Sequence, residues 1–205
     1  RISNPLHTHG VVGLHGKLIK RSIISRNNLS FEEELRFFED EVLMFDILAF
    51  TRSMKYVRKQ LYTYNINSNR NVKSARTEAF VRPFLISYFK LIKSHAQNSL
   101  GQRGLSAQES EKFGDQAFIY WIIFTLVLRS LSIAKGKMNL EEGIKYRKKL
   151  IDDLTTNSDI SKSIRNYSPS REESQWIPRA LAWRSSKFLK FTLDRRVKEI
   201  LRTRA

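Results

Sequence analysis

The chain has 205 residues and no cysteine, which excludes disulfide bonds and thiolate metal sites and is typical of a reducing compartment. Lysine and arginine total 37 against 20 aspartate and glutamate, a formal net charge of +17, so we expect an anionic partner such as nucleic acid, an anionic membrane face or an acidic polymer. The length suits one domain or one and a half, and the sequence has no Gly-rich phosphate-binding loop.

The first residues are rich in histidine and glycine. His7 and His9 are two apart, so on a strand they would share a face and could hold a metal, but no further ligand follows closely. Histidines of a loop or strand near an acceptor groove are therefore favoured over a metal site. Residues 17–24 are typical of a strand end that runs into a short helix, and Asn27-Asn28 is typical of a turn.

A dense acidic stretch then precedes the apolar residues 42–50. Ser30 with Glu33 three residues later has the spacing of a capping box, so one interpretation is a solvated, well-capped helix start. The other interpretation is functional. Asp40 would lie where the chain enters the helix, whose N–H groups favour an ionised carboxylate, and such a group can act as a general base.

The helix after Asp40 has an apolar stripe wide enough to pack against a sheet. Residues 54–64 follow it with the β-branched and aromatic composition of a strand. Tyr62 and Tyr64 are two apart on that strand, so both line a cleft or both pack in the core, and packing is favoured. A polar, basic linker covers residues 68–74, where we place a domain boundary.

Helices are predicted throughout the remainder. The first runs from Thr77 to about Leu100, where glycines interrupt it. Ser106 and Glu109 form a second capping box, which opens a helix that reaches about Ala134. Its apolar run of twelve residues is shorter than the roughly 20 needed to span a bilayer, which favours a buried core helix. The last predictions before the tail are a charged amphipathic helix at 140–154 and a loop at 155–170.

The tail, residues 176–205, carries nine basic and two acidic residues together with an apolar face. A basic amphipathic helix with aromatic side chains can lie on an anionic membrane surface. The alternative is a helix that docks on its own domain and leaves its basic face in water. Both interpretations stay open.

Four motifs between residues 10 and 72 follow one another in an order that resembles the C-terminal half of a family 2 glycosyltransferase catalytic domain, of the bacterial capsule and surface-polysaccharide kind. The motifs are Lys17-Leu18-Ile19-Lys20-Arg21, Asn28-Leu29-Ser30-Phe31, Phe37-Phe38-Glu39-Asp40-Glu41 and Tyr62-Thr63-Tyr64-Asn65-Ile66-Asn67. The resemblance implies an α+β fold of the GT-A type. Residues 1–72 would be the acceptor-side half of an α/β catalytic domain with few strands and one prominent helix, and residues 73–205 an all-α region. It also implies a fragment, with the nucleotide-binding half and its Asp-x-Asp motif upstream.

The resemblance further implies an inverting enzyme that transfers a sugar from a nucleotide-sugar donor to a hydroxyl of a glycan acceptor in the cytoplasm, or on the inner face of the cell membrane. Asp40 would be the catalytic base. A divalent cation, Mg or Mn, is expected in the full-length enzyme with ligands mostly outside this chain. Acceptor contacts are expected from Glu39, His15, Lys17, Tyr62 and Tyr64, and contacts to a phosphate or acidic acceptor from Lys20 and Arg21.

Two positions depart from the pattern of this family. Many members have a histidine, sometimes a metal ligand, where this chain has Asn67, so we expect no metal ligand in this half. A tryptophan is common at the position of His15, which puts that acceptor contact in doubt.

Charge alone favours a different class, a basic helical module that binds nucleic acid. The acidic residues 32–41 would repel phosphate, however, and the sequence has no known DNA- or RNA-binding motif. A third class is a peripheral membrane adaptor that uses only the tail.

Overall fold

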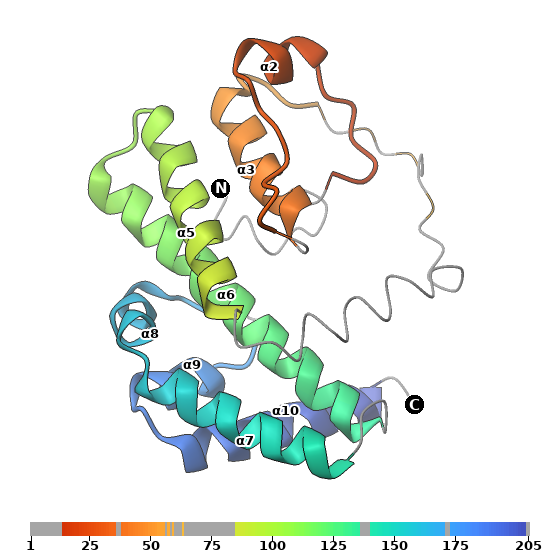
Figure 1. Ribbon diagram of the computed structural model, residues 1–205, viewed down its shortest axis with the longest axis vertical. Helices are drawn as coiled ribbons and strands as arrows, with labels where there is room; N and C mark the ends of the chain where they lie inside the picture. Colours follow the sequence, from red (N-terminus) through yellow and green to blue (C-terminus); the bar gives the residue numbers. More distant parts are fainter. Residues whose placement is uncertain are drawn as a thin grey trace. The chain divides into compact units, whose positions relative to one another are not determined.

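The computed structural model describes residues 14–35, 38–55, 57, 59, 63, 85–135, 140–170 and 173–203, and every regular element in these ranges is helical (Figure 1). The elements are α2 (Arg21–Arg26), α3 (Glu39–Phe50), α5 (Leu85–Gln102), α6 (Ala107–Ala134), α7 (Leu140–Thr156), α8 (Ser158–Ser163), the 3-10 turn η1 (Ile164–Asn166), α9 (Trp176–Ala182) and α10 (Ser186–Thr203). The chain divides into two compact units, one up to Gly114 and one from Asp115 onward.

The predicted α+β fold is wrong. None of the described residues belongs to a strand, and the described positions between 54 and 64, which include Met54, Val57 and Lys59, have no sheet partner. Lys17 to Lys20, predicted as a strand end, is likewise irregular before α2 begins. Tyr62, Tyr64 and the predicted boundary between residues 72 and 73 lie outside the described residues.

The reason is that helices and irregular chain cover the apolar surface of α3 that was predicted to meet a sheet. Five of six consecutive residues near the start of α3 are buried, so the helix is apolar on more than one side. These residues are Val42, Leu43, Met44, Phe45 and Ile47.

One side of α3 packs against the segment that leads into it. Leu43, Met44 and Ile47 form a cluster with partly buried side chains on and around α2, namely Leu14, Ile19, Ile23 and Leu29. Burial of apolar side chains of this size contributes about 1.5–3 kcal/mol each. The described residues 14–29 therefore pack on α3 without a sheet.

The other side of α3 lies along α5, and the two helices run in the same direction (Figure 1). Near the start of both, the rings of Phe38 and Phe89 are 6.0 Å apart. In the middle, Asp46 faces His95, and at the far end the Arg103 guanidinium donates a hydrogen bond of 3.3 Å to the Thr51 carbonyl. This register fixes which ends of the two helices lie together.

The predicted capping box at the start of α6 is confirmed. The Glu109 N–H donates to the Ser106 hydroxyl, and the Glu109 carboxylate accepts from the Ser106 N–H at 3.0 Å. At the end of the first unit, a Cβ on Gly114 would collide with the Gln97 side chain and lie 2.9 Å from the Lys93 carbonyl oxygen. Gly114 therefore permits α5 and α6 to approach closely.

The second unit contains the rest of α6 with α7, α8, α9 and α10. The helix predicted at 140–154 is confirmed as α7, but the predicted loop at 155–170 is wrong, because α8 and η1 occupy most of it. The signal was present in the sequence. The Asn157 side chain caps α8 by accepting hydrogen bonds from the backbone N–H groups of Asp159 and Ile160.

The tail forms two helices rather than one. Arg184 ends α9 with a positive φ of 53°, and its guanidinium donates hydrogen bonds of 3.1 Å to the carbonyls of Thr155 and Thr156 at the end of α7. After this turn, α10 buries Leu189, Leu193 and Val197 in its own unit.

Candidate functional site

The residue predicted as a general base, Asp40, lies in the first turn of α3 and is half-buried. Glu39 and Glu41 flank it, so three carboxylates share the turn whose N–H groups carry partial positive charge. The Glu41 N–H donates a 3.1 Å hydrogen bond to Asp40 Oδ1. The capping box predicted for Ser30 and Glu33 does not open this helix, because α3 begins eight or nine residues after Ser30.

The backbone just before Asp40 is unusual. Phe38 precedes α3 with a φ of 66°, in the left-handed region that bulky residues rarely adopt. The Phe38 ring packs against the ring of Phe89 on α5, and this contact helps to hold the Phe38 backbone in that conformation. Residues held in such backbone conformations gather at functional sites.

The structure brings Lys17 close to Asp40. Burial lowers the pKa of the Lys17 ammonium from its usual value, and the negative charge of Asp40 opposes that shift. Lys17 is half-buried and belongs to the first of the four motifs, whereas Asp40 belongs to the third. Two motifs separated by more than twenty residues therefore influence each other electrostatically near the start of α3.

The other predicted site residues are less closely assembled. Glu39 is half-buried beside Asp40, whereas His15, Lys20 and Arg21 are exposed on the turn before α2 and at its start. Tyr62 and Tyr64 lie outside the described residues, as do His7, His9 and Asn67. In the part of the chain that the structure describes, no three His, Asp or Glu side chains are arranged to bind a metal ion.

Sequence reasoning missed an ionic cluster on the α5 side of α3. His95 Nδ1 lies 3.0 Å from Asp46 Oδ1, and His95 Nε2 lies 3.7 Å from Glu32 Oε2. The hydrogen bond with Asp46 raises the pKa of His95. Burial opposes the shift, and the charges of Asp46 and Glu32 add to it. The signal was Asp46 itself, a single carboxylate inside an apolar run that needs a partner.

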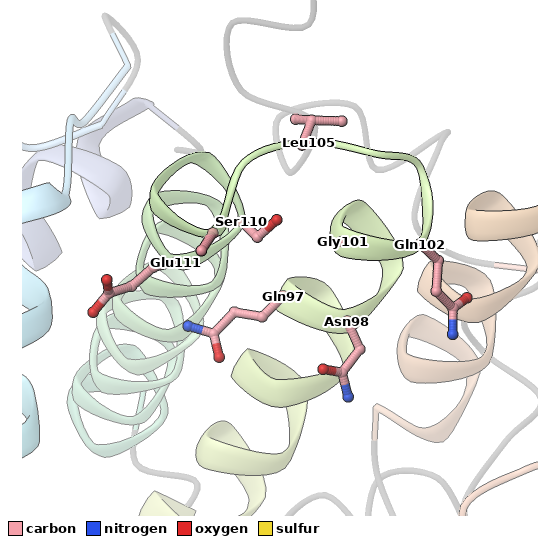
Figure 2. Close-up of a pocket in the computed structure, with 8 residues that line it drawn as sticks. Gln97, Asn98, Gly101, Gln102, Leu105, Ser110 and Glu111 are labelled. Atoms are coloured by element: carbon pink, nitrogen blue, oxygen red, sulfur yellow. The ribbon is translucent and has the colours of Figure 1, made fainter.

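An open groove of about 680 Å³ lies where α5 ends and α6 begins. Gln97 of α5 and Ser110 of α6 extend between the two helices, and Leu105 lies on the turn that joins them (Figure 2). Because α3 and α5 run in the same direction, this groove is at the Thr51 end of α3, about 16 Å along the helix from Asp40. The groove therefore does not serve Asp40.

One helix of the described part of the chain, α6, is long and apolar enough to cross a membrane. However, 72% of its most apolar 18-residue stretch is buried inside the protein. That burial agrees with the core helix predicted from the sequence.

No protein-family model, curated protein or solved structure matches this chain. The functional conclusion therefore depends on the residues and their geometry.

Proposed function

We propose that residues 14–50 form part of the acceptor side of an inverting glycosyltransferase in which Asp40 is the general base. The observation that carries the proposal is that the negative charge of Asp40, in the first turn of α3, acts on the half-buried ammonium of Lys17, because it relates two of the four motifs to each other. The left-handed Phe38 just before Glu39 and Asp40 gives further support, since it fixes the direction in which the helix starts.

In the proposed reaction an acceptor hydroxyl lies against the Asp40 carboxylate. The carboxylate takes the hydroxyl proton as the oxygen forms a bond to the anomeric carbon of the donor sugar, and the bond from that carbon to the nucleoside diphosphate breaks on the opposite face. The N–H groups of the first turn of α3 carry partial positive charge beside this carboxylate. In this proposal Glu39 accepts a hydrogen bond from a second acceptor hydroxyl.

The donor nucleotide and its divalent cation belong, in this proposal, to a part of the enzyme outside residues 14–50. The residues described in this chain do not fit a metal site, and the steps above involve none. Two apolar side chains of the first two motifs are exposed and available for contact with such a part. Leu18 is fully exposed and Phe31 is 52% exposed. The resemblance that supports this function also implies a cytoplasmic location.

The test compares Asp40→Asn with Glu34→Gln in the full-length protein, with release of nucleoside diphosphate from a panel of nucleotide-sugars as the assay. Glu34 is an exposed carboxylate in the loop before α3, so its variant is a matched control for loss of one negative charge. Loss of a general base lowers kcat by about 10²–10⁴-fold. We expect that loss for Asp40→Asn with nucleotide-sugar binding unchanged, and little change for Glu34→Gln. Turnover retained in Asp40→Asn would reject the assignment.

A further inference from the structure

Four aromatic side chains on α9 and α10 form one continuous surface, which we call the aromatic patch: Trp176, Trp183, Phe188 and Phe191. The rings of Trp183 and Phe188 are stacked with centroids 5.4 Å apart, and those of Phe188 and Phe191 with centroids 6.4 Å apart. Trp176 meets Phe188 edge-on at 6.3 Å. Trp183 is 65% exposed and Phe191 is 60% exposed, so the patch faces water.

Packing within the second unit does not explain the patch. The opposite side of α10 already supplies the contacts that hold this helix, since Leu189 and Leu193 are fully buried. Docking of the tail on its own unit therefore accounts for one face of α10 and leaves the aromatic face without a structural role. Exposed apolar patches bordered by polar residues mark interaction sites.

Cations border the patch. On α10, Lys187, Phe191, Arg195 and Lys198 follow one another at spacings of four, four and three residues, so they share a face, and all four are exposed. On α9 the Arg179 guanidinium lies 4.8 Å from the Trp176 ring centroid. The negative charge of the nearby Asp194 carboxylate is balanced by ion pairs with both Arg147 and Lys190.

We propose that the aromatic patch and its bordering cations dock the second unit on an anionic lipid surface. Tryptophan and phenylalanine side chains insert at the level of the headgroups, where their rings leave water, while lysine and arginine remain at the charged surface. The 18 residues of α10 would lie in the plane of the membrane, with the buried side of the helix still packed on its own unit.

The same residues suit nucleic acid less well. Stacking of bases needs ring faces that are open on a platform. In the patch Phe188 already stacks with Trp183 and with Phe191, and Arg179 lies over Trp176, so the rings present one apolar surface rather than separate platforms. A second copy of this chain is also a poor partner. Its patch carries the same lysines and arginines, so the two patches would repel each other.

The proposal is tested by sedimentation of the full chain with vesicles of phosphatidylcholine alone or with 30% phosphatidylglycerol. We expect binding to the anionic vesicles only, and quenching of tryptophan fluorescence by brominated lipid, because Trp183 is exposed and Trp121 is buried. Trp183→Ser with Phe191→Ser should weaken binding by about tenfold or more. Neutralising Lys187, Arg195 and Lys198 to glutamine should weaken it by about 100-fold, from the contribution of each cation near an anionic surface.

The matched control neutralises three exposed lysines of α7 instead, Lys145, Lys148 and Lys149. It removes the same charge from the same unit away from the patch, so we expect a much smaller loss. Circular dichroism confirms that each variant is folded. Equal losses of vesicle binding in the two triple variants, or absence of quenching by brominated lipid, would overturn the proposal. So would a lipid-free dimer that Trp183→Ser with Phe191→Ser dissociates. Tight binding of poly(U) that the aromatic substitutions abolish would overturn it in favour of nucleic acid.

Discussion

Removal of the Asp46–His95 contact should destabilise the first unit in a manner that depends on pH. The two side chains are each 23% exposed and their nearest atoms are 3.0 Å apart. Hydrogen bonds to charged groups contribute about 1.5–3 kcal/mol, and partial exposure places this one at the lower end. We therefore expect a coupling energy of about 1–2 kcal/mol from a double-mutant cycle of Asp46→Asn, His95→Gln and the double variant.

The direction of the pH dependence follows from the raised pKa of His95. A group whose pKa is raised in the folded state contributes stability that is fully present below its unfolded value of 6.5 and is lost as pH rises through the folded value. The coupling energy, measured by urea unfolding, should thus be larger at pH 6 than at pH 9.

The control for this cycle is Ser94→Ala. The Ser94 hydroxyl donates only to the Leu91 carbonyl within α5, so its removal should have the same effect at both pH values. A coupling energy that is unchanged between pH 6 and pH 9 would refute the reasoning, because Asp46 would then hold a neutral imidazole as firmly as a charged one.

Two further predictions concern backbone positions. Gly114→Ala should destabilise the first unit by about 1–3 kcal/mol in thermal unfolding, because the new Cβ meets the Lys93 carbonyl oxygen. The control is Gly101→Ala, where the nearest neighbour of the new Cβ is Ser110 Oγ at 4.0 Å. This variant should be neutral or stabilising by up to about 1 kcal/mol. Equal effects would show that α5 and α6 do not approach closely. Arg184→Ala should destabilise the second unit by about 1 kcal/mol more than Arg184→Gly does. Both variants lose the hydrogen bonds to the carbonyls of Thr155 and Thr156, but only glycine adopts the positive φ without strain. The reverse order in urea unfolding would contradict that account.

The parts of the fold that the sequence predicted correctly are those set by local signals. The capping box of Ser106 and Glu109 spans four consecutive residues, and the helix α3, which was predicted from its apolar pattern, is twelve residues long. Such signals are read directly from spacing, since the interacting groups are neighbours in the chain.

What the sequence did not predict depends on contacts between distant residues. A wide apolar stripe on α3 is equally suited to a sheet and to a second helix, and only its burial against α5 and the segment before it distinguishes the two. The pairing of Asp46 with His95 spans 49 residues and has no local pattern. The electrostatic effect of Asp40 on Lys17 was not predicted either, because no periodicity relates residues this far apart in the chain.

Two elements of this chain have the composition of membrane-contacting helices, and the structure separates them. The apolar side chains of α6 are already buried among other helices, so entry into a bilayer would require the surrounding fold to open and lose that packing. The apolar side chains of the aromatic patch are in water, so their transfer to a lipid surface costs no internal contact. Positive charge borders that patch on α9 and α10, whereas the most apolar part of α6 is nearly free of it. A membrane contact made by this chain is therefore expected at α10 and peripheral.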